Sequence, residues 1–141
     1  MKYIKYTKAR FKYQLVENFS IQTDILGYEI SVPKFIKLDR LGTLYIYTGY
    51  AWDGASGIAI DTKNFMRGSL VHDALYQLMR WGLLPHKYKI VADKLLIKVC
   101  HEDGMSKIRC TWVYLGVKYG GGPSTKKTHK RKVYQAPRRK E

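Results

Sequence analysis

The hydrophobic pattern of this chain changes its period near Asn64, and this change limits the fold more than any other feature. Before it, apolar residues alternate with polar ones in short segments, from Phe11 to Leu15 and around Ile30 and Val32, as in half-buried strands. After it, apolar residues recur at helical spacing. Strands followed by helices predict an α+β fold, with a small antiparallel N-terminal sheet beside a three-helix core.

The second half of the chain has the start and stop residues of three helices. The first is predicted from Asn64, which can cap a helix, to Gly82, and the second follows Pro85, from about Lys87 to Glu102. The third begins near Ser106 and carries an apolar stripe at helical spacing, which we expect to lie in the core. Its members are Ile108, Trp112, Leu115 and Tyr119.

The chain is strongly basic, and much of the charge lies at its end. Its 141 residues suffice for one domain, predicted over 1–122, after which a Gly-Gly-Gly-Pro segment leads into a basic extension, 123–141. The net charge is +15, and the extension holds eight basic residues against one acid. Such a segment binds polyanions, so nucleic acid and anionic membrane are candidate partners; a solvated tail without a partner is the alternative. The predicted polyanion-binding residues are Lys126, Lys127, Lys130, Arg131, Lys132, Arg138, Arg139 and Lys140.

Several classes of protein do not fit the sequence. Cys100 and Cys110 form neither a disulfide framework nor a CxxC metal pair, so we expect reduced thiols. The sequence has no signal peptide and no apolar run of membrane-span length, which predicts a soluble protein made in a cytoplasm. No histidine precedes His72, as a His-Asp metal phosphohydrolase requires, and the GxSxG elbow of serine hydrolases is absent.

Two polar residues on apolar helix faces, His72 and Asp93, are predicted to lie opposite each other. The turn from Gly82 to Pro85 is short enough to fold the two helices back antiparallel, and His72 lies eleven residues before Leu83 while Asp93 lies ten after it. A buried carboxylate needs a donor, which an imidazole N–H supplies, leaving the other ring nitrogen free as a base. The alternative is a polar bridge that only locks two helices together.

Asp73 follows His72 but points about 100° away around the helix, so we expect a different role for it. Upstream, the segment from Trp52 to Gly57 is WDGASG, whose glycines and small residues permit a tight loop with carbonyl groups turned inward. Carbonyl oxygens and a carboxylate are the ligands of a hard cation such as calcium. The alternative is a simple turn without a ligand.

These motifs carry two resemblances. The order of a glycine-rich loop, then HDALY from His72 to Tyr76, then ADKLLIKVC around Asp93 resembles the phospholipase A2 superfamily, and the short spacing is closest to the capsid phospholipase domains of parvoviruses. A strand-rich start followed by DGAS and HDxLY motifs is similar, over most of residues 10–120, to a domain-of-unknown-function family encoded by tailed phages and prophages. The second resemblance is the closer one.

The phospholipase resemblance implies roles for individual residues. His72 would activate water, Asp93 would orient His72, and Tyr76 would hydrogen-bond Asp93. Calcium, with a loop N–H, would hold the oxyanion of the attacked ester, and its implied ligands are the carboxylate of Asp73 and the backbone carbonyls of Trp52, Gly54 and Ser56. The chain departs from the family because it is not disulfide-rich, because Ser56 stands where a glycine is usual and because Asp53 is added to the loop.

Two functions are predicted. The first is a bacteriophage structural or accessory protein, carried in the virion, in which the His-Asp scaffold is a clamp and the basic extension binds nucleic acid or other phage proteins. The alternative is a calcium-dependent, phospholipase-like esterase acting on host membrane lipid. Both place the protein in the host cell cytoplasm or the virion.

Overall fold

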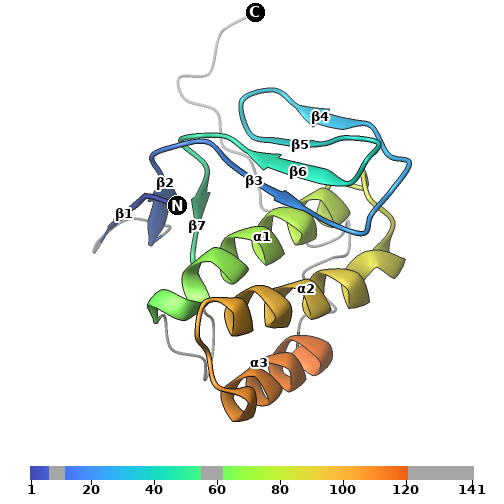
Figure 1. Cartoon of the computed structure of the whole chain (residues 1–141). Helices are drawn as coiled ribbons and strands as arrows, with labels where there is room; N and C mark the ends of the chain where they lie inside the picture. Colours follow the sequence, from blue (N-terminus) through green and yellow to red (C-terminus); the bar gives the residue numbers. More distant parts are fainter. Residues whose placement is uncertain (7–11, 55–61, 121–141) are drawn as a thin grey trace, which may run out of the picture.

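The fold is α+β, as predicted, with short strands followed along the chain by helices (Figure 1). The computed structural model describes residues 1–6, 12–54 and 62–120. Ser56 and the eight predicted polyanion-binding residues of the extension lie outside these ranges. Among the helices within them, none has the length and apolar character needed to cross a membrane.

The strands form two antiparallel sheets where the sequence predicted one. The first has the order β1-β2-β7 and the second has the order β3-β6-β5-β4. The chain passes from one sheet to the other between the end of β2 and the start of β3. The bounds are β1 Tyr3–Lys5, β2 Tyr13–Leu15, β3 Phe19–Gln22, β4 Ile30–Val32, β5 Ile36–Leu38, β6 Thr43–Ile46 and β7 Ala51–Trp52.

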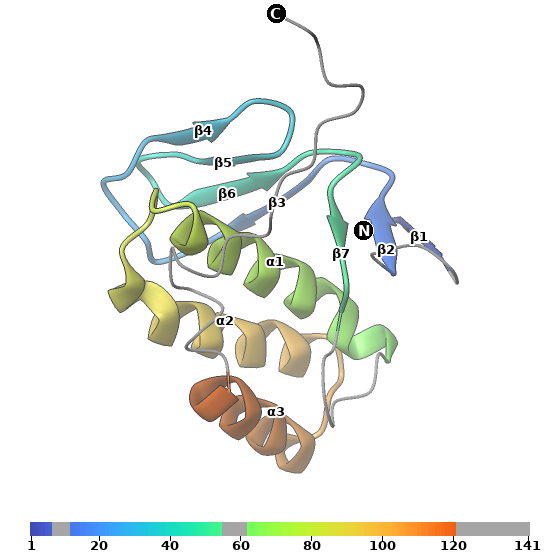
Figure 2. The same cartoon turned by 180° about the vertical axis from the view of Figure 1, so that it is seen from behind.

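Alternating burial turns one face of the larger sheet toward the helices. Ile36 and Leu38 are fully buried, whereas Lys37 between them is exposed. The register pairs Ile36 with Ile46 and Leu38 with Leu44, and both partners are also fully buried. Four aliphatic side chains therefore lie on one face of the sheet, which covers α1 (Figure 2).

The first helix lies at the centre of the molecule. It is α1, Lys63–Arg80, and it is buried around most of its circumference because the sheets cover one side and α2, Lys89–Glu102, covers the other (Figures 1 and 2). A turn of 3-10 helix, His86–Tyr88, precedes α2. The third helix, α3, Lys107–Gly120, packs on the outer side of α2. The three predicted helices are confirmed, although the N-cap of α1 is Thr62 and not Asn64.

Helix α3 buries the face opposite to the one predicted. Cys110 and Val113 are buried in a small second core with Leu96 and Met105. The predicted core stripe is exposed to solvent instead: Ile108 at 75%, Trp112 at 71%, Leu115 at 38% and Tyr119 at 75%. The prediction that this stripe lies in the core is wrong, because the helix is apolar on two faces and only one of them can contact α2.

Gly68 permits the close approach of α1 to α2. A Cβ atom at this position would lie 2.8 Å from the sulfur of Cys100 and 3.1 Å from the backbone oxygen of Leu96. Both distances are shorter than ordinary van der Waals contact. Since a backbone oxygen cannot rotate aside, a larger residue at Gly68 has to push the two helices apart.

We expect Gly68→Ala to lower the free energy of unfolding by about 1–3 kcal/mol, the usual effect of overpacking, although alanine is the better helix former by about 1 kcal/mol. Gly116→Ala in α3 is the matched control, because a Cβ atom there meets nothing within 4 Å. That control should raise the free energy of unfolding by about 0.5–1 kcal/mol. Urea unfolding followed by circular dichroism measures both, and a stabilised Gly68→Ala variant would contradict the close approach.

Candidate functional site

His72 of α1 and Asp93 of α2 lie opposite each other, as predicted from the short turn between their helices. Nε2 of His72 is 2.8 Å from Oδ1 of Asp93. His72 is 7% exposed and Asp93 is 2% exposed, so the hydrogen bond between them is shielded from water. Residues that are 21 positions apart are thereby joined in the interior of the helix pair.

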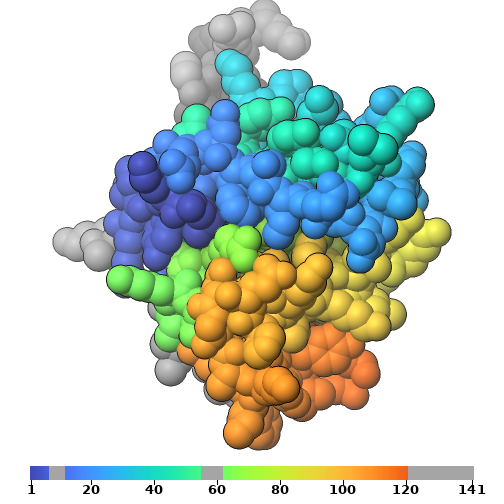
Figure 3. Space-filling model, viewed as in Figure 1, coloured from blue at the N-terminus to red at the C-terminus, as the bar shows by residue number. Residues whose placement is uncertain are grey.

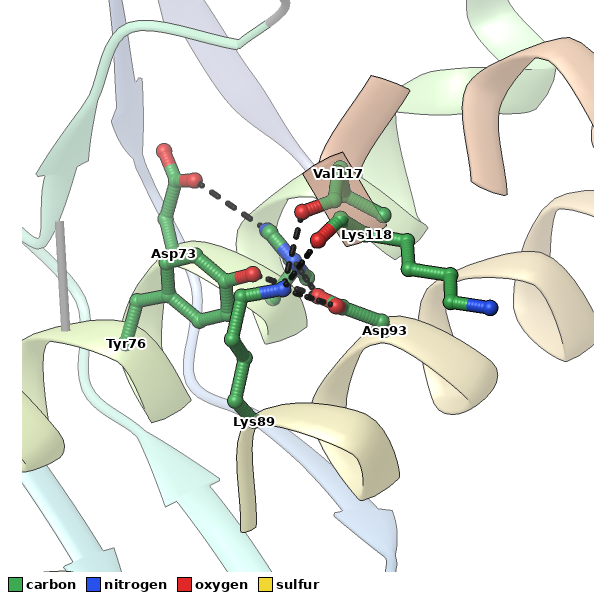
Figure 4. A network of polar contacts seen from close by, with 7 residues as sticks. Asp73, Tyr76, Lys89, Asp93, Val117 and Lys118 are labelled. Atoms are coloured by element: carbon green, nitrogen blue, oxygen red, sulfur yellow. Dashed lines mark hydrogen bonds and ion pairs between the residues drawn. The ribbon is translucent and has the colours of Figure 1, made fainter. Parts of the chain in front are cut away.

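The carboxylate of Asp93 accepts hydrogen bonds from three side chains. Besides His72, the hydroxyl of Tyr76 donates to Oδ1, as predicted, and Nζ of Lys89 donates to Oδ2 at 2.7 Å (Figure 4). Burial alone would raise the pKa of Asp93, but the bonds from His72, Lys89 and Tyr76 outweigh it and lower the pKa. An ionised carboxylate only accepts, so Nε2 of His72 carries a hydrogen, and in the neutral form of the ring Nδ1 keeps its lone pair.

Lys89 is a member of this site that the sequence analysis missed. It lies one turn before Asp93 on α2, and its side chain is only 12% exposed. Its Nζ also donates to the backbone oxygens of Val117 at 2.9 Å and Lys118 at 3.2 Å, in the last turn of α3 (Figure 4). A cation at this end of a helix is favourable. The i,i+4 spacing of Lys89 and Asp93 was a signal for their ion pair, but the contact with α3 has no local signature.

Asp73 lies beside the other nitrogen of the same imidazole. Its Oδ1 is 3.9 Å from Nδ1 of His72, too far for a hydrogen bond, and the two groups form an ion pair only when the imidazole is protonated. Its side chain is one-third exposed, unlike that of Asp93. Burial lowers the pKa of His72, but the carboxylates of Asp73 and Asp93 outweigh it, so the net pKa of His72 is raised. The ring therefore lies between two carboxylates, one bound to Nε2 and one facing Nδ1.

The segment that begins the WDGASG loop is anchored on α1. Trp52 at the end of β7 is buried, and its Nε1 donates to the hydroxyl of Ser69 at 3.1 Å. Gly54 has a φ of +73°, a conformation that glycine adopts without strain. Trp52 and Gly54 thus have a defined position, while Ser56 lies outside the described residues.

The oxygen donors of the described residues are of the chemical type that calcium binds. The pKa of Asp73 is raised, chiefly by burial and in smaller part by the carboxylate of Asp53, while His72 lowers it. Calcium takes six to eight oxygen ligands, including backbone carbonyls, which Trp52 and Gly54 offer. The described part of the chain has no group of three or more His, Cys, Asp or Glu side chains that could hold a metal, so backbone oxygens would have to complete such a site.

Comparison of the chain with protein-family models, with curated proteins and with solved structures finds no match. The chemistry of the site is therefore judged from its geometry. A histidine with one nitrogen bonded to a carboxylate and the other free of hydrogen bonds to the described residues has the parts of a general base. A polar bridge between helices would explain the bond of Asp93 to His72, but it would not require a second carboxylate, that of Asp73, beside the same ring.

We expect Lys89→Met to lower the free energy of unfolding by about 3 kcal/mol, which is near the lower limit for a broken buried ion pair because Asp93 keeps two donors. Lys98→Met is the matched control, since Lys98 is an exposed lysine of the same helix, and its effect should stay within about 0.5 kcal/mol. Urea unfolding of both variants tests this, and equal effects would show that Lys89 contributes no more than a surface lysine.

Asp93 should leave a signature in the acid dependence of stability. Its folded-state pKa lies below the ordinary value of 3.8, so the folded chain binds fewer protons than the unfolded chain, and this contribution to stability is lost as the pH falls through the folded pKa. Asp93→Asn removes the contribution. The free energy of unfolding of the variant, measured from about pH 5 downward, should fall less steeply than that of the wild type. Parallel curves would contradict the lowered pKa.

Proposed function

We propose that this chain is a calcium-dependent, phospholipase-like esterase in which His72 is the general base. The observation that carries the proposal is the position of one imidazole between two carboxylates, with Nε2 bonded to Asp93 and Nδ1 lying 3.9 Å from Asp73. The phospholipase A2 resemblance of the HDALY and ADKLL segments agrees with these positions. A tailed phage as the source, and host membrane lipid as the substrate, follow from the resemblances and belong to the same proposal.

The proposed reaction is hydrolysis of a carboxylic ester. Nδ1 of His72 takes a proton from water while the water oxygen attacks the carbonyl carbon. The ester C–O bond then breaks, and the same proton passes from Nδ1 to the leaving alkoxide. Asp93 stabilises the imidazolium that exists between these steps, and its bonds from Tyr76 and Lys89 hold it in place. Calcium, when bound at Asp73, would supply positive charge for the oxyanion.

Fatty acid release from phosphatidylglycerol vesicles, with calcium or with a chelator, tests this function. We expect release by the wild type in calcium only. His72→Asn should reduce the release about 100-fold or more, the typical contribution of a general base. Asp73→Asn should abolish the calcium-dependent release. His86→Asn is the matched control, since His86 is an exposed histidine outside the site. No calcium-dependent release by the wild type would reject the proposal.

A second candidate is a phage structural or accessory protein in which the network is a clamp. The contacts of Lys89 favour it, because its Nζ joins α2 to the backbone of α3 and, through Asp93, to α1. In addition, every side-chain nitrogen or oxygen of the described residues that is wholly closed to solvent has a hydrogen-bond partner. On this proposal the basic extension, 123–141, binds nucleic acid or another phage protein. It predicts that His72→Asn loses stability and that the wild type releases no fatty acid.

A further inference from the structure

Helix α3 carries an exposed apolar stripe on the side away from its packed face. The stripe consists of Ile108, Trp112, Leu115 and Tyr119, and at about 100° per residue these four positions fall within about 60° of one another. Three of the four are more than two-thirds exposed. Helix α3 lies at the outer edge of the molecule, beyond α2 (Figures 1 and 3). An exposed apolar row of this size on one helix face indicates an interaction surface.

The charge around the stripe is positive. Lys107 and Lys118 are exposed and lie on the same flank of the helix, and the sequence of α3 contains no acidic residue. The ammonium group of Lys118 lies 5.4 Å from the ring centre of Tyr119. The whole chain carries +15. A partner for this surface therefore has to accept apolar side chains and also provide negative charge.

These two requirements point to one kind of partner. A second copy of the chain would bring equal positive charges together, which opposes association. Nucleic acid would match the charge but offers little contact to a row that includes Ile108 and Leu115. An anionic bilayer matches both, since helices that lie in the interface plane have an apolar face with a flank of lysines, and Trp and Tyr prefer the headgroup level.

We propose that the stripe of α3 docks on an anionic lipid bilayer, with Trp112 and Tyr119 at the headgroup level and Lys107 and Lys118 facing the lipid phosphates. The proposal goes beyond ester hydrolysis and does not depend on it, because it concerns a surface that either candidate function could use. The orientation of α3 is fixed by the bonds from Lys89 to the backbone of its last turn. Docking would therefore orient the whole helix core relative to the membrane.

The test uses the full chain and vesicles of ether-linked phosphatidylglycerol, which contain no carboxylic ester bond, so that a failure of hydrolysis leaves the result unaffected. We expect the wild type to co-sediment with these vesicles and not with ether-linked phosphatidylcholine, and Trp emission to shift to the blue on binding. Trp112→Phe should remove most of the shift, because Trp52 is buried at 3% exposure and the third tryptophan, Trp81, is partly buried against the first core and lies outside α3.

Removing apolar surface from the stripe should weaken binding. The double variant Ile108→Ser with Tyr119→Ser keeps Trp112 as reporter and should lower the partition coefficient at least about tenfold. The matched control is Leu26→Ser with Leu41→Ser, which removes two similarly exposed leucines, 62% and 76%, outside α3. This control should bind like the wild type. Circular dichroism and urea unfolding establish that both double variants are folded.

Three outcomes would overturn the proposal. Unchanged binding of the stripe variant would mean that another part of the chain, such as the basic extension, carries the lipid affinity. Equal binding to neutral vesicles would remove the role of the lysine flank. A wild-type dimer in sedimentation equilibrium that dissociates in the stripe variant would identify the stripe as a contact between two copies of the chain.

Discussion

The organisation of the helices depends on one buried charge, the carboxylate of Asp93. An ionised group at 2% exposure is unfavourable unless donors surround it, and here the donors come from two helices: His72 and Tyr76 on α1, and Lys89 on α2 itself. Lys89 extends the network to backbone oxygens of α3. The apolar cores give these helices their adhesion, and the carboxylate with its donors requires one specific register between them.

The same network makes a clamp and a base from one set of residues. The three donors lower the pKa of Asp93, and an acceptor-only carboxylate determines which nitrogen of His72 bears the hydrogen. A network that only holds the helices together would need no further residue. The position of Asp73 beside Nδ1, with one-third of its side chain exposed, has no role in a clamp and gives the esterase proposal its support.

Most of the helix pairing was predictable because it depends on short-range rules. The pairing of His72 with Asp93 follows from one tight turn and a count of residues on either side, whereas the bond from Tyr76 to Asp93 was implied by the phospholipase resemblance. Two features were beyond such rules. The apolar stripe of α3 was assigned to the core, since periodicity shows that a stripe exists but not which of two apolar faces meets a neighbour. The bonds of Lys89 to Val117 and Lys118 depend on where α3 packs, which no local pattern determines.

The two cores are unequal, and this has a consequence for how the molecule opens. The first lies between the sheets and α1 and includes 20 buried residues, whereas the core that holds α3 includes six. With so little apolar surface retaining it, α3 should separate from the rest at a much lower free energy than global unfolding requires. Amide hydrogens of α3 would then exchange with solvent through local opening, while those of α1, enclosed on both sides, would exchange only when the whole domain unfolds.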